Sequence, residues 1–225
     1  MCGIMTEKNR DNQWTVEDWD VIDYNEAYAR QKAAVQGVLS GHGPYLFLCE
    51  HPPVITLGRL AESRHILISA DALKQRGIPV VAIDRGGDVT LHAPGQLVVY
   101  PILNLKNYRR DLRWYLDKLE QVAIDLLKDF DILTCRLPGR TGVWVESKKI
   151  VSIGVGVKQW VTFHGLAINI NTALPLFNLI KPCGLDVLMT SVQQVQGAAV
   201  DMLDVKRLCQ RHCLRIFAAG GHRIS

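Results

Sequence analysis

Hydrophobic residues recur at helical spacing in three segments of the chain, each bounded by residues that begin or end helices. The first runs from about Tyr24 to Leu39, where Asp23 and Glu26 have the spacing of a capping box. The second lies at Asp111 to Phe130 and the third at about Asp201 to Phe217. The second helix has an apolar stripe that predicts a buried face and comprises Leu112, Leu116, Leu119, Val122, Ala123, Leu126, Leu127 and Phe130.

Short apolar runs between turn residues predict strands. They are Tyr45 to Cys49, Val54 to Leu57, Val80 to Ile83, Val143 to Val145, Ile150 to Val157 and Leu166 to Ile170. Val80 to Ile83 is expected to be buried, and a short helix from Ser69 to Gly77 precedes it. Because strands and helices mix without a regular βαβ alternation, the pattern favours an α/β fold (α+β, mixed or mainly antiparallel sheet) with helices packed on the sheet.

No Gly-, Pro- or Ser-rich linker and no repeat divides these elements, so we expect a single domain over residues 15–225. Residues 1–14 form a polar N-terminal extension without the apolar core of a signal peptide. No apolar stretch approaches the roughly 20 residues that span a bilayer. These features predict a cytoplasmic protein with no membrane partner.

The composition excludes several classes of protein. With 225 residues, 48% of them hydrophobic and 21% charged, the chain has enough apolar surface to fold. A formal net charge of +4 is far from the dense basic surface of a nucleic-acid-binding protein. The six cysteines are irregularly spaced and suggest no disulfide framework. Cys209, His212 and Cys213 match no standard zinc spacing, so helix packing is expected for them and no metal site is predicted.

The segment from Arg85 to Gln96 holds the densest set of candidate binding residues. Gly86 and Gly87 allow backbone amides to approach a ligand, and Arg85, Thr90 and His92 can point into the space that they leave. A strand turn with a structural histidine is the alternative. The glycine spacing fits neither a P-loop nor a dinucleotide fingerprint.

Two further segments each carry one reactive residue type. Lys149 follows the turn Glu146-Ser147-Lys148 and begins a glycine-containing strand; a solvated lysine at a strand edge is the alternative. Cys183 stands between a proline and a glycine and is therefore expected on a turn, where a thiol can gain thiolate character. A structural role remains open for it, whereas Cys49 and Cys209 are expected to act as small buried hydrophobes. His164, at a strand entrance, could orient a ligand or satisfy a carbonyl.

Taken together, these segments resemble the lipoyl(octanoyl) transferase family. The resemblance rests on Glu50 to Arg59, on Arg85-Gly86-Gly87 through Thr90, His92, Pro94-Gly95-Gln96 and Tyr100-Pro101, on Thr141-Gly142-Val143-Trp144-Val145, on Lys149-Ile150 with Ser152-Ile153-Gly154, on His164-Gly165-Leu166-Ala167, and on Pro182-Cys183-Gly184 with Thr190-Ser191. Order and spacing agree as well as residue type over most of residues 45–191. The family's fold is similar to the single-domain sandwich of biotin and lipoate protein ligase catalytic domains.

The resemblance implies an acyltransferase with a dyad of Cys183 and Lys149, in which Cys183 forms an acyl-thioester and Lys149 lowers its pKa and handles protons. It also implies substrate contacts by three stretches, namely Arg85, Gly86, Gly87, Asp88, Val89, Thr90, Leu91 and His92; Ser152, Ile153 and Gly154; and Gly165, Leu166 and Ala167. The glycines would let the chain pass close to an acyl group. No cofactor and no metal is implied.

The implied reaction moves an octanoyl or lipoyl group from acyl carrier protein to a lysine of a lipoyl domain, as the first step of protein lipoylation. The implied acceptors are the lipoyl domains of 2-oxoacid dehydrogenase complexes and the glycine cleavage H protein. Because carrier partners of the family are acidic, docking is predicted to use basic residues such as Arg109, Arg110 and Arg113. Two alternatives are an ATP-dependent lipoate or octanoate protein ligase and a non-catalytic acyl-binding protein.

Overall fold

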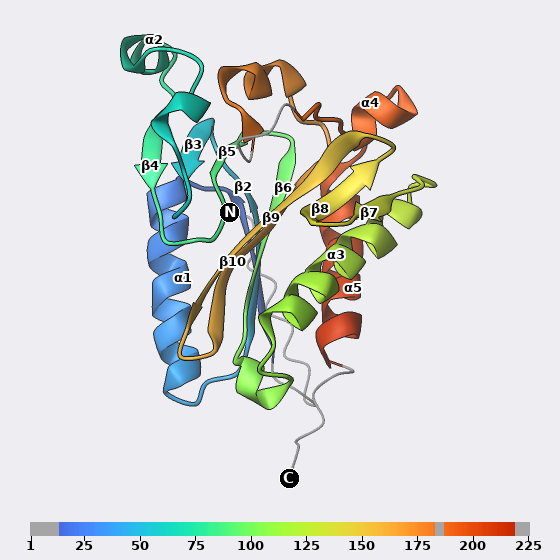
Figure 1. Ribbon diagram of the computed structural model, residues 1–225. Coiled ribbons are helices and arrows are strands. Elements are labelled where there is room, and N and C mark those ends of the chain that lie inside the picture. The colour runs from blue at the N-terminus through green and yellow to red at the C-terminus, as the bar shows by residue number, and fades with distance from the viewer. Residues whose placement is uncertain (1–13, 183–186, 219–225) are drawn as a thin grey trace, which may run out of the picture.

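The computed structural model describes residues 14–182 and 187–218, and within these residues a seven-stranded sheet forms the centre of the molecule (Figure 1). In spatial order its strands are β1 (Thr15–Val21), β2 (Tyr45–Glu50), β6 (Gln96–Ile102), β10 (Val161–Asn169), β9 (Lys148–Lys158), β8 (Arg140–Val145) and β7 (Cys135–Leu137). The pair β1 and β2 is parallel, and every other neighbouring pair is antiparallel. The prediction of a mixed, mainly antiparallel sheet is therefore confirmed.

A smaller sheet lies at one end of the large one and carries the segment rich in candidate binding residues. It contains β4 (Val80–Ala82), β3 (Val54–Leu57) and β5 (Val89–His92), with β3 between the other two. The prediction that the strand at Val80 is buried is wrong. Val80 is 40% exposed, because β4 is an edge strand that pairs with β3 alone.

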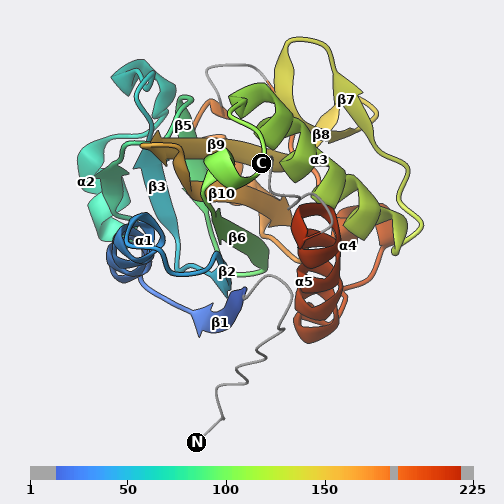
Figure 2. The ribbon, with the colours of Figure 1, turned by 90° about the horizontal axis from the view of Figure 1, so that it is seen from below.

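Helices cover both faces of the large sheet (Figure 2). On one face lies α1 (Tyr24–Leu39), and on the other lie α3 (Leu112–Lys128) and α5 (Met202–Ala218). The short helices are α2 (Ala70–Gln75), α4 (Val192–Gln196) and the 3₁₀ turns η1 (Ser63–His65), η2 (Leu105–Asn107) and η3 (Leu174–Leu179). None of the helices in the described ranges is long and apolar enough to cross a membrane.

The alternation of side chains along each strand divides the core into two layers. In β2, Leu46 and Leu48 belong to the cluster under α3 and α5, whereas Phe47 and Cys49 belong to the cluster under α1. Cys49 is fully buried, as expected for a cysteine that acts as a small hydrophobe. Because both faces of the sheet are covered, its central strands β6 and β10 are buried at every position.

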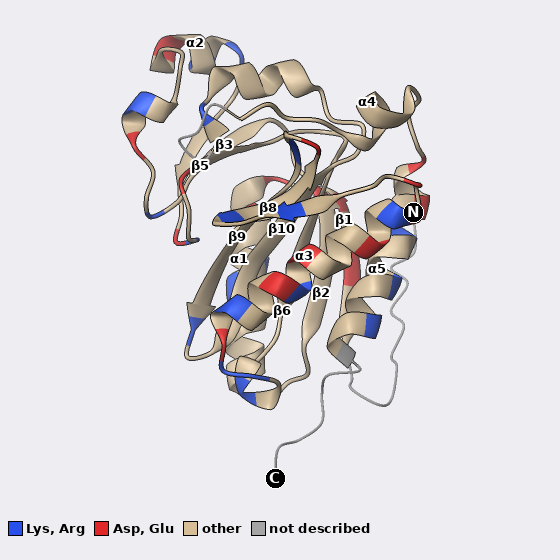
Figure 3. Cartoon of the chain, turned by 45° about the vertical axis from the view of Figure 1, so that its right-hand side comes forward, with Lys and Arg blue, Asp and Glu red and all other residues tan. Residues whose placement is uncertain are grey.

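The predictions of helix caps, of the buried stripe and of strand bounds need correction. Asp23 caps α1, but Glu26 pairs with Arg30 at 2.6 Å, so the reciprocal half of the capping box is not made. Leu112 is 43% exposed at the start of α3, whose outward face carries acidic and basic positions (Figure 3). The sequence patterns missed β1, where three acidic residues interrupt the alternation, as well as β5, β6 and β7, and they began β10 five residues too late.

Candidate active site

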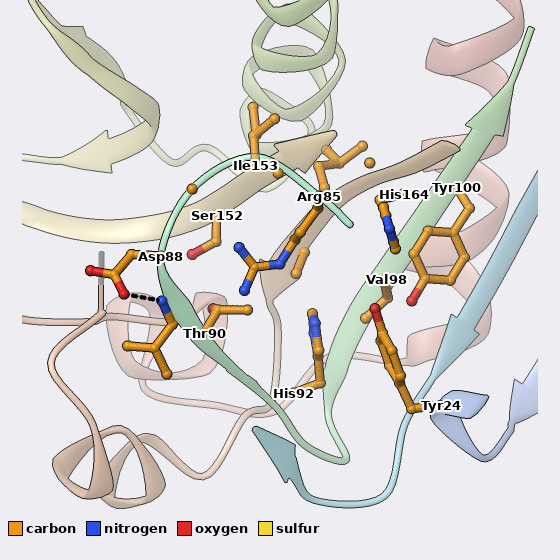
Figure 4. A pocket seen from close by; sticks show the side chains of 16 residues that line it. Tyr24, Arg85, Asp88, Thr90, His92, Val98, Tyr100, Ser152, Ile153 and His164 are labelled. Carbon is orange, nitrogen blue, oxygen red and sulfur yellow. Dashed lines mark hydrogen bonds between the residues drawn. The ribbon is translucent and has the colours of Figure 1, made fainter. Parts of the chain in front are cut away.

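A pocket opens where the small sheet meets the face of the large sheet that α1 covers (Figure 4). Its empty volume is about 500 Å³, part of it open to solvent. The lining comes from the first residue of α1, the loop before β5, β5 itself, β6, β9 and β10. Segments separated by more than 100 positions in the chain therefore meet at one place.

Twelve of the fourteen residues expected to contact substrate line this pocket. They are Arg85, Gly87, Asp88, Val89, Thr90, His92, Ser152, Ile153, Gly154, Gly165, Leu166 and Ala167. The structure places the other two elsewhere. Leu91 is fully buried in the core of the small sheet, and the Gly86 N–H donates to the Val155 carbonyl at 2.8 Å. Leu91 faces away from the pocket because neighbouring residues of a strand point to opposite sides.

Four lining residues were not among the predicted contacts, namely Tyr24, Val98, Tyr100 and His164. Tyr100 and His164 belong to the motifs that carry the family resemblance, so a signal for them existed in the sequence. Tyr24 and Val98 have no such signal. They reach the pocket only because α1 and β6 pack beside the small sheet.

Arg85 is a buried cation in the pocket wall, only 7% exposed. Its Nη2 donates to the carbonyl of Thr56 at 2.8 Å and to the Thr56 hydroxyl at 3.0 Å, which ties the loop before β5 to β3. In Figure 4 its guanidinium extends toward Thr90 and Ser152. A Cβ on Gly154 would lie 2.8 Å from Arg85 Cδ. Gly154 therefore makes room for Arg85, which is a different reason from the expected close approach to an acyl group.

His92 is a neutral ring in the floor of the pocket. Burial, together with the positive field of His51 and Arg85, lowers the pKa of His92 to about 3. The ring stacks on Tyr24, with centroids 5.8 Å apart, and its Nδ1 lies 2.8 Å from Oε1 of Gln96. His92 thus carries no charge at neutral pH.

His164 lines the pocket with a backbone φ of 56°, in a region that side chains other than glycine rarely adopt. Its Nε2 lies 3.0 Å from Asp84 Oδ1, and the ring stacks on Tyr28. Burial outweighs the Asp84 carboxylate and lowers the pKa of His164 to about 4. For Asp84, burial acts to raise the pKa, but hydrogen bonds from Tyr28 and His164 outweigh it and lower it. The positive φ of His164 strains the backbone, and backbone strain is common at functional sites.

Lys149 is buried, with 4% of its surface exposed, so the alternative of a solvated strand-edge lysine is wrong. Its Nζ lies 5.5 Å from the ring centre of Trp144. A Cβ on Gly142, whose φ is 126°, would lie 2.7 Å from Lys149 Cε. The Lys149 side chain therefore rests in a seat formed by β8 before the hairpin.

Cys183 lies outside the described residues, but the chain on both sides of it is held in place. On the preceding side, the Lys181 N–H donates to the carbonyl of His65 at 2.7 Å, and His65 Nδ1 is 2.6 Å from Oδ2 of the pocket residue Asp88. On the following side, the Lys149 N–H donates to the carbonyl of Leu188 at 2.8 Å. A second groove, beside η3, touches Pro182 and Val187, the described residues on either side.

The remaining described cysteines and histidines offer no metal centre. Within residues 14–182 and 187–218, no three His, Cys, Asp or Glu side chains gather as metal ligands would. Cys209 and Cys213 are fully buried in the core between α5 and the sheet, which confirms the predicted packing role. His212 instead binds Asp129 at 2.7 Å.

Comparison with known proteins agrees with this fold and identifies the family. The model of the lipoyl protein ligase A/B catalytic domain matches residues 23–214. An octanoyltransferase of Syntrophotalea carbinolica is 47% identical over 193 residues, which are 85% of this chain and 88% of that protein. An octanoyltransferase of Bacteroides fragilis is 42% identical over 209 residues, which are 88% of this chain and 95% of that protein.

Solved structures share the fold at much lower identity. A lipoate-protein ligase A bound with ATP has a TM-score of 0.70 at 14% identity, covering 91% of this chain and 85% of that one. A biotin protein ligase of Aquifex aeolicus has a TM-score of 0.53 at 12% identity, covering 92% and 70%. The predicted likeness to both ligase folds is confirmed.

The fold and the matched domain define an acyltransferase of the lipoyl protein ligase A/B type. Within that class, the chain belongs to the octanoyltransferase family.

Proposed function

We propose that this protein transfers an octanoyl or lipoyl group from acyl carrier protein to a lysine of a lipoyl domain, through an acyl-thioester on Cys183. The observation that supports this most strongly is a set of contacts on either side of the segment that contains Cys183. Before it, Lys181 is linked through His65 to the pocket residue Asp88, and after it, Leu188 is hydrogen-bonded to the buried Lys149. Leu188, which contacts the Lys149 backbone, is five residues from Cys183, a reach of at most about 18 Å. A thiol on this tether can approach the Lys149 ammonium.

In the first step, the Cys183 thiolate attacks the thioester carbonyl of the carrier. The new carbon–sulfur bond replaces the old one, and the carrier's thiol leaves with a proton. An ammonium near Cys183 favours the thiolate over the thiol, which is the role we assign to Lys149. Because one thioester is exchanged for another, the step needs no ATP.

In the second step, the amine of the acceptor lysine attacks the acyl-enzyme, the Cys183 thiolate leaves and the amine loses a proton. The product is an amide, which makes the transfer effectively irreversible. Lys149 is also an amine and must not accept the acyl group. Its seat against Gly142 and Trp144 holds it in one place, which keeps it off the attack path while it relays the proton.

The pocket supports an aliphatic acyl group as the cargo. The apolar residues Val98 and Ala167, which belong to the core layer under α1, line it beside the few polar groups. Burying an eight-carbon tail contributes about 5 kcal/mol, at roughly 0.8 kcal/mol for each methylene. We expect only modest discrimination by chain length, since one methylene is worth about 1 to 3 kcal/mol.

The partners would be the octanoyl carrier protein, the lipoyl domains of 2-oxoacid dehydrogenase complexes and the glycine cleavage H protein, in the cytoplasm. Docking at Arg109, Arg110 and Arg113 has little structural support. They follow η2, where the Leu105 N–H donates to the carbonyl of Trp160, in the turn after β9. Lys149 lies at the other end of β9, whose 11 residues extend over about 35 Å. Lys148 and Lys181 flank the dyad positions more closely, and we assign carrier docking to their side of the molecule.

Intact-mass measurement tests this proposal directly. Incubation with octanoyl carrier protein is expected to add one octanoyl mass to the chain without ATP, and Cys183→Ala and Cys183→Ser are expected to lose it. Cys135→Ser, which removes an exposed cysteine, serves as the control and keeps the label. Labelling that persists in both Cys183 variants would remove Cys183 from the role.

The same experiment separates the alternatives. A ligase would acylate nothing from the carrier and would need ATP and free octanoate. An acyl-binding protein would hold octanoate but never transfer it to a lipoyl domain. The presence of both Lys149, in its buried seat, and Cys183 favours the transferase over these two.

A further inference from the structure

A chain of buried polar side chains runs from the pocket to the backbone of Lys149. Its members are His92 on β5, Gln96 on β6, Asn169 on β10 and Thr190 before α4, and each is less than a tenth exposed. Successive distances are 2.8 Å from His92 Nδ1 to Gln96 Oε1, 2.9 Å from Gln96 Nε2 to Asn169 Oδ1 and 2.9 Å from Asn169 Nδ2 to Thr190 O. Thr190 N then donates to the Lys149 carbonyl at 2.9 Å.

The direction of every hydrogen bond in this chain follows from its end. The Thr190 carbonyl can only accept, so Asn169 must turn its amide nitrogen toward it. Asn169 Oδ1 then faces Gln96, which must present its own nitrogen there and its oxygen to His92. His92 therefore carries its hydrogen on Nδ1. In the neutral ring, Nε2 is then a bare acceptor.

We propose that Gln96 and Asn169 are positioning residues that fix His92 as a hydrogen-bond acceptor in the acyl pocket and hold the Thr190 backbone on Lys149. This inference rests on the proposed transferase function. One set of side chains thereby links the floor of the acyl pocket to the strand that presents the catalytic lysine. An acceptor at His92 cannot stabilise an oxyanion, so it turns the acyl carbonyl oxygen away from itself and can receive an N–H of the attacking amine.

The geometry around His92 makes its state sensitive to one substitution. The titratable and charged groups that face it are Tyr24 from α1, His51 after β2, Arg85 from the loop before β5 and His164 from β10. Gln96→Glu would add a buried carboxylate at 2.8 Å from Nδ1, which raises the pKa of His92 and places a second proton on Nε2. The acceptor then becomes a donor below the new pKa.

The first test needs no substrate and does not depend on the proposed function. Nitrogen NMR of isotope-labelled histidine rings in the resting protein is expected to show His92 as the Nδ1–H tautomer, with its signal assigned by its absence in His92→Asn. Gln96→Leu is expected to abolish the preference for that tautomer. A His92 ring protonated on Nε2 in the unmodified protein would overturn the proposal, even if the variants failed to fold.

The second test measures acyl transfer against pH. Gln96→Glu is expected to acquire an acid limb that the unmodified protein lacks, and Asn169→Asp is expected to lose roughly 10- to 100-fold in kcat with little change in KM. Gln193→Glu, at an exposed position near Thr190, adds the same charge outside the chain and is expected to change neither. Identical pH profiles for Gln96→Glu and Gln193→Glu would refute the inference. If the unmodified protein formed no acyl-enzyme, the proposed function would be refuted instead.

Discussion

Lys149 shows how a long side chain with a charged end can be accommodated in a buried position. The aliphatic part of its side chain occupies the space that a side chain at position 142 would fill. Its Nζ lies over the ring of Trp144, whose face attracts a cation. Its backbone makes two hydrogen bonds to the strand-like segment Leu188 to Thr190. The same residue thus positions an ammonium and anchors the chain that follows Cys183.

Replacing Lys149 with arginine is expected to reduce turnover by about 100-fold or more, although the charge is kept. The guanidinium is larger than the seat against Gly142, and it does not release a proton near neutral pH. The measurement is kcat for octanoyl transfer, with thermal unfolding to confirm that the variant is folded. Lys148→Arg, one residue earlier, is the matched control and should retain turnover. Unimpaired turnover in Lys149→Arg would refute proton transfer by Lys149.

At the scale of single residues, the sequence indicated which residues belong to the candidate site but not what surrounds each of them. The motifs pointed to Arg85, His92 and Lys149, but residue type alone left Lys149 open between a solvated edge and a buried position. Its burial depends on Gly142 and Trp144, which contact it across a hairpin. Leu91 could not be separated from Thr90 and His92 by motif, because only the strand pairing decides which side chains face the pocket.

The helix α3 begins at a side-chain cap. Asp111 accepts a hydrogen bond from the Trp114 N–H at 3.0 Å, which satisfies one of the amide groups that the first turn leaves without a partner. The helix then buries Tyr115, Leu119 and Val122 against the sheet. Burial on this face stabilises the helix, and the cap fixes where it begins.

Asp111→Ala is expected to lower the free energy of unfolding by about 1 kcal/mol, the usual cost of losing an N-cap, without changing octanoyl transfer per folded molecule. Chemical denaturation measures the first effect and steady-state kinetics the second. Asp117→Ala, exposed on the same helix and remote from its end, is the control and should change stability by less than about 0.5 kcal/mol. Equal losses in the two variants would contradict the capping role.

The bounds of α1, α2 and α3 followed from the sequence because apolar spacing and caps act locally. The exposure of the edge strands did not. β1 carries acidic residues because it pairs on one side only, and β4 is exposed for the same reason. An edge position is a property of the whole sheet, so no local pattern predicts it.

At the scale of the whole molecule, the pocket exists because two sheets meet under α1. The motif residues lie on β5, β9 and β10, and only the order β6-β10-β9 together with the small sheet brings them into one cavity. The family resemblance supplied this grouping before the structure, whereas hydrophobic patterns alone did not. Two buried histidines, His92 and His164, are a consequence of closing that cavity from both sides.

These histidines make the stability of the whole molecule depend on pH. Their pKa values, about 3 for His92 and about 4 for His164, lie below the value near 6.5 of an unfolded chain, so the unfolded state binds more protons between these limits. Stability is therefore complete above pH 6.5 and falls as the pH drops toward 4. Between pH 6.5 and 5 the loss is about 2 kcal/mol for each histidine, since one pKa unit is about 1.4 kcal/mol.

Urea denaturation at pH 7 and pH 5 measures this loss, and His164→Asn is expected to make it smaller by about 2 kcal/mol. Asparagine removes the titration and tolerates the positive φ of position 164. His42→Asn, at an exposed histidine, is the control and should leave the pH dependence unchanged. If His164→Asn and His42→Asn kept the same pH dependence, burial of a neutral His164 would not be the source of the acid sensitivity.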